Sequence, residues 1–271
     1  MDTFHPQSPN AISYFTVAIN IISGLGIEVA IHGLVSVCTR LLDPKKRELK
    51  VYIIAALLIT CNISAIVYIA LGLYLQYVAG PSTCRIAGFV NNLTSHILNI
   101  SFDSVVLSKC YYITNRNKYT LFCIALVFTN RIGWCIADLI RSYAFWDDTY
   151  ALCLYFQDPN TGLGYNTADI INDAFATITA LIVTYLRFSV SSKFIQSMMI
   201  RTIVRSILVI AASGWVLYVS LNSTDIVWYY IAWNTQIYVL VRMINLDVLL
   251  DSGKIKADTD SAKLDNIVFL E

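Results

Sequence analysis

Seven stretches of the 271-residue chain are mostly apolar and are long enough to cross a bilayer as helices. A hydrocarbon core of about 30 Å needs about 20 residues at a rise of about 1.5 Å each. The stretches cover residues 12–38, 51–78, 86–112, 119–143, 166–189, 202–221 and 225–246. We therefore predict an all-α membrane protein, with a seven-helix transmembrane domain over residues 1–246 and a tail over residues 247–271.

Polar side chains form a stripe along the third stretch, within residues 84–109. Asn92, His96, Asn99 and Asp103 follow one another at spacings of 4, 3 and 4. This spacing keeps side chains on one face of a helix. The other positions are mostly Ile, Leu, Val and Phe, so the polar face is expected to contact protein and the apolar face lipid. The pattern predicts a buried polar seam on the third helix.

Composition agrees with a membrane protein, and the distribution of charge predicts how the chain is oriented in the membrane. Hydrophobic residues make up 57% and charged residues 14%, against about 45–50% and about 25% in soluble domains. The net charge of +1 gives no reason to expect a nucleic-acid partner. Lys and Arg cluster in segments 39–50, 116–118 and 187–201, whereas segment 146–164 has three acidic residues and no basic one. The positive-inside rule therefore predicts an external N-terminus and a cytosolic tail.

Ionisable side chains inside the predicted spans are candidates for function. Each costs about 2.5–3.5 kcal/mol on insertion scales, so each needs a partner or a water-filled cavity. Those in the outer halves of the fourth and fifth spans lie at similar depth. With polar residues of the third span they are predicted to line a ligand cavity open to the outside: Asn91, Asn92, His96, Asp138, Arg141, Asp169 and Asp173. The alternative is that these charges pair, also with Arg131, and hold helices together.

One ion pair is predicted from depth alone. Glu28 in the first span and Arg242 in the seventh both lie about 25 Å from the outer face. These two spans are neighbours in a ring of seven helices. We therefore predict a structural Glu28–Arg242 ion pair.

The predicted topology separates the cysteines into two groups. Five lie within spans or at cytosolic span ends, and only Cys84 and Cys153 face the outside. Lasting disulfides form on the exoplasmic side of a membrane. We predict a Cys84–Cys153 disulfide that ties segment 146–164 to the third helix, the alternative being two free thiols.

With these features the chain resembles the rhodopsin-like G-protein-coupled receptors. Lys109 lies 25 residues beyond Cys84, where that family has the Arg of its Asp-Arg-Tyr motif. Asn234 and Tyr238 have the spacing of its Asn-Pro-x-x-Tyr motif, with Thr235 in place of proline. Trp134 and Trp215 correspond to the family's tryptophans in spans 4 and 6, with Leu217 in place of the proline of span 6, and Asn62 lies roughly where the family has its span-2 aspartate. The resemblance implies signalling roles for Lys109, Asn234 and Tyr238 and coupling to a heterotrimeric G protein.

Enzymatic chemistry is not indicated by the sequence. It has no H-E-x-x-H, no G-x-S-x-G and no Gly-rich phosphate loop. His32 and His96 lie on different spans without an evident third ligand, so we expect no metal and no cofactor. A retinal protein would need a Schiff-base lysine in its last span, and segment 225–246 has none.

The first hypothesis is therefore a multi-pass plasma-membrane receptor that senses an extracellular ligand and signals to a cytosolic partner. The short basic inner segments also suit anionic membrane lipids. A small-solute or ion transporter that uses the polar stripes of the third to fifth spans is the alternative. A membrane scaffold without a ligand is the third hypothesis.

Overall fold

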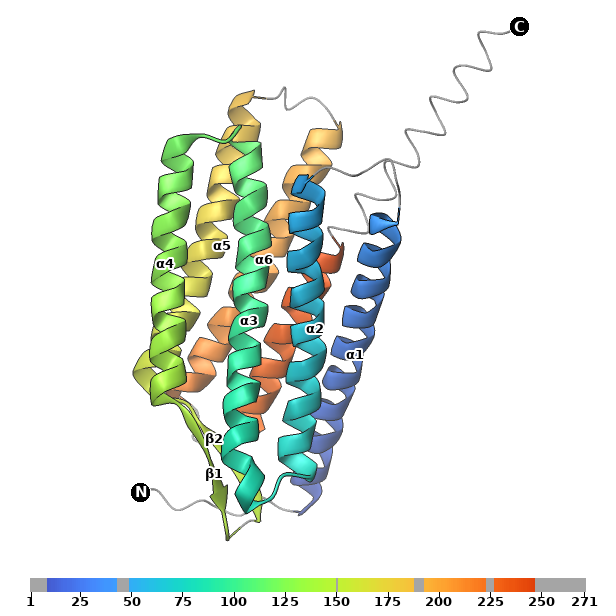
Figure 1. Ribbon diagram of the computed structural model, residues 1–271, viewed down its shortest axis with the longest axis vertical. Coiled ribbons are helices and arrows are strands. Elements are labelled where there is room, and N and C mark those ends of the chain that lie inside the picture. The colour runs from blue at the N-terminus through green and yellow to red at the C-terminus, as the bar shows by residue number, and fades with distance from the viewer. Residues whose placement is uncertain (1–8, 43–48, 150, 188–192, 223–226, 247–271) are drawn as a thin grey trace, which may run out of the picture.

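The computed structural model describes residues 9–42, 49–149, 151–187, 193–222 and 227–246, and the predicted tail lies outside this range. The described residues form seven helices and one β-hairpin, arranged as an elongated bundle (Figure 1). The helices are α1 (Pro9–Leu41), α2 (Leu49–Tyr77), α3 (Pro81–Ile113), α4 (Lys118–Arg141), α5 (Pro159–Arg187), α6 (Lys193–Asn222) and a last helix at 227–246. Strands β1 (Tyr143–Asp147) and β2 (Leu152–Phe156) form the hairpin at one end of the bundle.

Five helices of the described chain are long and apolar enough to cross a membrane: α1, α2, α4, α5 and α6. They indicate a multi-pass membrane protein. Helix α3 is not among them, because a large share of its surface is polar and turned into the protein. Its Asn92, His96, Asn99 and Asp103 are all buried. The predicted polar seam is therefore confirmed.

Several helices begin earlier than the apolar pattern predicts, α6 by nine residues, and proline explains the early starts of α3 and α5. Helix α3 begins at Pro81 rather than at residue 86, and α5 begins at Pro159 rather than at residue 166. Proline suits the first helical position, where its missing N–H leaves no bond unmade. The Oδ1 atom of Asp158 accepts from the backbone N–H groups of Asn160 (3.1 Å) and Thr161 (3.0 Å), which caps α5. The polar first turns of α5 are thus helical although they are not apolar.

The β-hairpin is the part of the fold that the all-α prediction omits. Its strands pair antiparallel with Trp146 opposite Cys153. The Oδ1 atom of Asp147 accepts from the backbone N–H of Thr149 at 2.8 Å, which stabilises the turn. Ala151, before β2, has a left-handed φ of 49°. Each strand has only five residues. An alternating pattern this short is not distinguished in the sequence from the long apolar stretches around it.

The hairpin is held against α3 in two ways. The predicted disulfide Cys84–Cys153 is present, with its Cα atoms 5.5 Å apart. One turn further along α3, Gly88 faces Ala144 so closely that a Cβ at Gly88 would overlap the Ala144 methyl group. The remaining cysteines of the described chain are free thiols: Cys38, Cys61, Cys110, Cys123 and Cys135. The hairpin is therefore a fixed cover over this end of the bundle.

Helix α1 and the last helix are neighbours, as the predicted ring requires. The Asn245 amide donates to the backbone oxygen of Val29 at 3.1 Å and to Oδ1 of Asn62 at 2.7 Å, joining three helices. The predicted Glu28–Arg242 ion pair is nevertheless absent from the described chain. Glu28 is 62% exposed and lies 3.9 Å from His32 on its own helix, and Arg242 is also exposed. Both side chains are exposed and not buried in the interface between the two helices.

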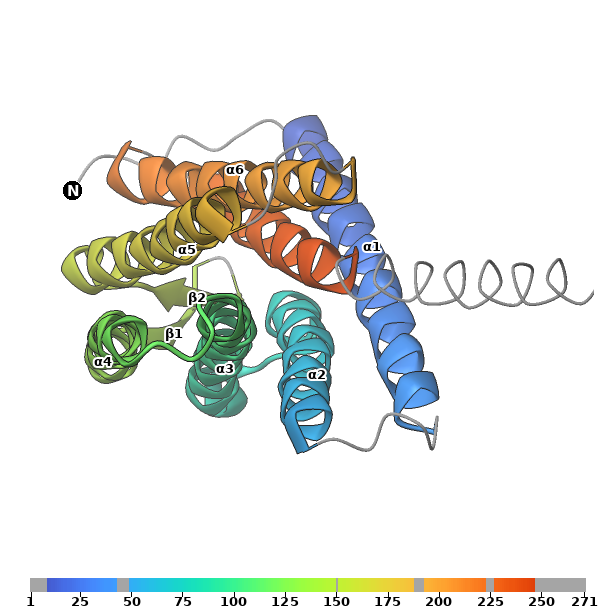
Figure 2. The same ribbon diagram turned by 90° about the horizontal axis from the view of Figure 1, so that it is seen from above.

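The apolar core lies in the middle of the bundle. Its central side chains include Leu98, Phe102 and Val105 of α3 with Val241 and Ile244 of the last helix. Viewed along the bundle, the last helix lies between α2 and α3 on one side and α6 on the other (Figure 2).

Candidate functional site

The carboxylate of Asp138 on α4 is the centre of a buried hydrogen-bond network beneath the hairpin. Its Oδ2 accepts from Asn92 (3.0 Å) and from Nε2 of His96 (2.9 Å), both on α3. Its Oδ1 accepts from Ser142 (2.8 Å) and from Thr161 (2.7 Å) at the start of α5. Four side chains, from α3, from the C-cap of α4 and from the start of α5, therefore meet at one carboxylate. Charge-assisted bonds of this kind are stronger than neutral ones and fix the spacing of α3, α4 and α5.

A second buried cluster lies deeper and surrounds Arg131 of α4, whose side chain is 0% exposed. Its guanidinium pairs with Asp169 of α5 and lies 3.7 Å from Asp103 of α3. It also lies over the ring of Tyr165, 5.2 Å from the ring centre, and Asn172 donates to Asp103 at 2.9 Å. A buried arginine needs such partners because an unpaired charge in the membrane interior is costly.

A third cluster joins α5 to α6. Asp173 lies 3.8 Å from Arg205 and accepts a hydrogen bond from Ser206. Arg205 also donates to the hydroxyl of Thr177 at 3.3 Å. The three clusters follow α5 through Thr161, Asp169 and Asp173, steps of about two turns and one turn. In the second and third clusters the buried charges contact opposite charges on a neighbouring helix.

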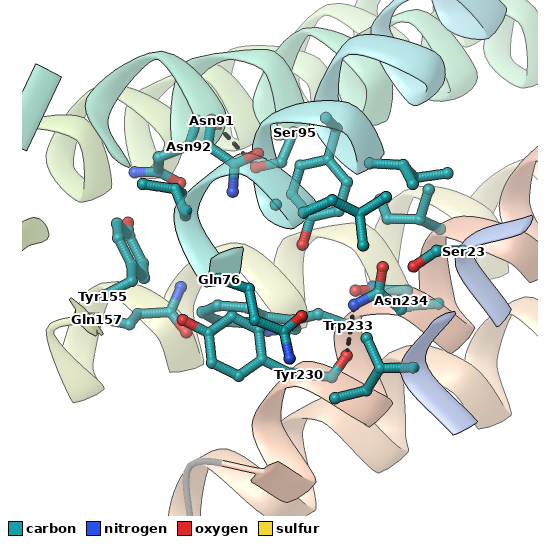
Figure 3. A pocket seen from close by; sticks show the side chains of 18 of the residues that line it. Ser23, Gln76, Asn91, Asn92, Ser95, Tyr155, Gln157, Tyr230, Trp233 and Asn234 are labelled. Carbon is teal, nitrogen blue, oxygen red and sulfur yellow. Dashed lines mark hydrogen bonds between the residues drawn. The ribbon is translucent and has the colours of Figure 1, made fainter. Parts of the chain in front are cut away.

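A cavity with a volume of about 50 Å³ lies beside the Asp138 network at the hairpin end. Its walls come from α1, α2, α3, β2, the start of α5 and the last helix. Figure 3 shows side chains of α3 and of the last helix pointing toward one another across it. Its amide side chains are Gln76, Asn91, Asn92, Asn99, Gln157, Asn234 and Gln236, and its aromatic ones are Tyr68, Tyr155, Tyr165, Tyr230 and Trp233.

The aromatic residues of the cavity contact one another at their edges. The ring of Trp233 lies 5.7 Å from that of Tyr155 and 5.9 Å from that of Tyr229, both in edge-on arrangements. Burial raises the pKa of the Tyr155 hydroxyl on β2, so this group stays neutral. Tyr165 also contacts the ring of His96 at 5.3 Å. The rings give the cavity rigid walls with polar edges.

The structure places the predicted ligand-binding residues at several different sites, not around one cavity. Asn91 and Asn92 line the cavity, whereas Asp138 and His96 lie behind its wall in the first network. Arg141 is 59% exposed at the surface, 3.9 Å from Asp158. Asp169 and Asp173 belong to the second and third clusters.

Several cavity residues were not singled out from the sequence, and a helical pattern could have found some of them. Tyr230, Trp233 and Ile237 share one face of the last helix with Asn234, which was predicted for signalling and not for ligand binding; the four recur at spacings of 3, 1 and 3. Gln76 and Gln157 carry no such signal, because they lie near the end of α2 and just after β2. Their approach depends on the hairpin.

A basic groove lies at the opposite end of the bundle, between α3, α5 and α6. It has a volume of about 280 Å³, and its lining includes Lys109, Arg201 and Arg205. Lys109 is one of the three predicted signalling residues. Of the others, Asn234 lines the cavity and donates to the backbone oxygen of Tyr230 at 2.8 Å, and Tyr238 packs half-buried against the core.

Comparisons with known proteins identify no family, because no protein-family model and no curated protein matches the chain. Within the described residues, no group of three or more His, Cys, Asp and Glu side chains is placed to hold a metal ion. The functional argument therefore rests on the cavity, the groove and the helices that join them.

Proposed function

We propose that this protein is a seven-transmembrane receptor of the G-protein-coupled type. In this proposal all seven helices cross the plasma membrane, the hairpin end faces outward, and a ligand in the cavity changes the opposite end. The observation that carries it is that α3 reaches both sites. Asn91 and Asn92 line the cavity, and Lys109 lines the groove about 17 residues further along the same helix.

The direction of signalling follows from charge and from the disulfide. Arg116 and Lys118 lie at the groove end, as do Lys109 and Arg201, which suits a cytosolic face by the positive-inside rule. The Cys84–Cys153 disulfide lies at the other end, which suits the oxidising exoplasmic side. A cytosolic partner, for which a heterotrimeric G protein is the first candidate, would contact the groove end.

The proposed mechanism is a shift between two arrangements of the bundle. A ligand that contacts both α3 and the last helix can stabilise one arrangement only through contacts that differ between the two. Both helices contribute to the cavity, and α3, α5 and α6 form the groove. The charge clusters between α3, α4 and α5 are then the rigid part against which α6 and the last helix move.

A transporter is the second candidate, and one observation favours it. Buried polar residues continue past the cavity along α3 from Asn99 to Asp103 and then across to Asn172 of α5. Such a series of polar groups is typical of substrate or ion paths in membranes. The apolar core around Phe102 interrupts it in this arrangement of the helices.

Nucleotide exchange on co-expressed heterotrimeric G proteins tests the receptor proposal without a known ligand, because a two-state receptor has basal activity. We expect exchange above that of membranes without the protein. Lys109→Ala, in the groove, should reduce it at least threefold. Lys118→Ala, an exposed basic residue at the same end, is the matched control and should keep it. Exchange no greater than in control membranes for every G-protein class would contradict the proposal.

A further inference from the structure

The cavity at the hairpin end has an uncharged lining. Among its described lining residues none is Asp, Glu, Lys, Arg or His. The nearby carboxylate of Asp138 is not part of the lining, and it already accepts from Asn92, His96, Ser142 and Thr161 and, at 3.5 Å, from Gln157. The contrast with the groove at the other end, which has three basic residues, shows that the absence of charge is particular to this site.

Four polar atoms at the cavity are buried and have no hydrogen-bond partner among the described residues. They are Oδ1 of Asn91, the hydroxyl oxygen of Tyr155, Oε1 of Gln157 and Nε1 of Trp233. They come from α3, from β2, from the segment after β2 and from the last helix, and Figure 3 shows these four side chains around the same space. Buried polar atoms are rarely left without a partner, because each costs about 1–3 kcal/mol. Two acceptors, one donor and one hydroxyl that can do either are therefore presented to whatever occupies the cavity.

The cavity also limits the size of its occupant. A volume of about 50 Å³ is room for a few water molecules, at about 10–15 Å³ each. It is well below the roughly 300–1,000 Å³ of sites for drug-sized ligands. An occupant of a few heavy atoms fits, and a larger one must extend out of the cavity.

We propose that this cavity binds a small uncharged molecule, or the uncharged end of a larger one, that both donates and accepts hydrogen bonds. A primary amide or a short polyol has this chemistry. An ion would enter a buried site without a counter-charge, which is far more costly than burying a neutral polar group. The inference names the ligand class for the receptor proposed above and rests on that proposal only for the consequence of binding, not for binding itself.

Binding of three molecules of the same shape and different charge tests the ligand class. Acetamide, acetate and acetamidinium each have four heavy atoms and are uncharged, anionic and cationic at neutral pH. We expect the purified full-length protein in lipid nanodiscs to bind acetamide at least tenfold more tightly than either ion, measured by ligand-observed NMR. Equal binding of the three, binding of an ion in preference, or no acetamide binding at high millimolar concentration would overturn the inference.

Substitutions of cavity residues test whether acetamide binds in this cavity. Asn91→Leu, which keeps the shape and removes the free acceptor, should weaken acetamide binding at least tenfold, as should Trp233→Phe. Asn91→Asp adds one negative charge at the same place and should reverse the preference toward acetamidinium, which a purely structural role of Asn91 would not produce. Asn222→Leu changes an exposed amide at the same end of the bundle and should bind as the unaltered protein does. Unchanged binding by Asn91→Leu and Asn91→Asp would place acetamide elsewhere and refute this site.

The same samples separate this inference from the receptor proposal. Acetamide binding that depends on Asn91, without any effect on nucleotide exchange, would support the ligand class and contradict the receptor. Nucleotide exchange that responds to an ion bound in the cavity would support the receptor and contradict the uncharged ligand class.

Discussion

At the scale of single residues, the bundle contains charged side chains that are fully buried, where an unpaired charge is most costly. Asp138 and Arg131 are 0% exposed, and each contacts side chains from two other helical segments. Asp138 is bound entirely by uncharged donors and His96, whereas Arg131 lies between the two carboxylates of Asp103 and Asp169. Removing one partner leaves a buried charge or a buried donor without its bond. These residues should therefore matter for stability before they matter for any signal.

Asp138→Asn is expected to destabilise the protein by about 3 kcal/mol, because it replaces an acceptor oxygen by an NH₂ group that faces donors. Thermal unfolding of the detergent-solubilised protein measures the effect. Asp148→Asn, at an exposed position of the hairpin turn, is the matched control and should change stability by less than about 0.5 kcal/mol. Equal melting temperatures for the two variants would show that the Asp138 network does not hold the helices.

Arg131→Met is expected to cost about 3–5 kcal/mol, since it leaves Asp103 and Asp169 buried near each other without a cation. Adding Asp103→Asn and Asp169→Asn to the same chain removes both unpaired charges. The triple variant should regain at least half of the lost stability in the same unfolding measurement. A triple variant less stable than Arg131→Met would contradict the assignment of this cluster as a mutually compensating set.

At the scale of elements, the hairpin and α3 form one unit. The disulfide Cys84–Cys153 and the contact of Gly88 with Ala144 lie on the same side of α3, one turn apart. The hairpin then continues into Gln157, which reaches both the cavity and Asp138, with its Nε2 at 3.5 Å from Oδ1. A displacement of the hairpin would thus change the cavity directly.

Gly88→Ala is expected to destabilise the protein by about 1–3 kcal/mol, because its methyl group would overlap that of Ala144. Ala144→Gly in the same chain removes the overlap and should restore most of the loss. Gly133→Ala on α4, where a Cβ meets open space, should be neutral or slightly stabilising by the better helix propensity of alanine. Unfolding temperatures of the four proteins check this, and a loss that Ala144→Gly does not repair would mean that the hairpin packs differently.

The elements also show how much the sequence could predict. Seven long apolar stretches predicted seven helices, and the described chain has seven, of which five are long and apolar enough to cross a membrane. The hairpin was missed because strands of five residues carry little periodic signal. Asn91 and Asn92 were found from the polar face of α3, but Gln76 and Gln157 reach the cavity only through tertiary packing. Depth predicted that Glu28 and Arg242 lie at one level and could not predict the direction of their side chains.

At the scale of the whole molecule, the two ends differ in charge and in structure. The hairpin end has a disulfide-fastened cover and an uncharged cavity, and the other end has the basic groove. This polarity fits a protein that receives a small molecule on one side of a membrane and contacts a partner on the other. It also makes the orientation of the chain in the membrane testable.

Single cysteines placed at the two ends should react differently with a membrane-impermeant maleimide on intact cells. Thr149→Cys in the hairpin turn is expected to be labelled, and Lys118→Cys at the start of α4 only after the membrane is permeabilised; both positions are exposed. The unaltered protein gives the background from its free thiols. The opposite pattern would place the groove outside the cell and would contradict the proposed direction of signalling.

The most direct measurement of the central claim is to follow nucleotide exchange and solute uptake in the same vesicles, which contain the protein and a heterotrimeric G protein. The account predicts that external acetamide changes the exchange rate at least twofold, that Asn91→Leu abolishes this response, and that acetamide uptake equals that of protein-free vesicles. Saturable, Asn91-dependent uptake with an unchanged exchange rate would contradict the receptor and identify the protein as a carrier.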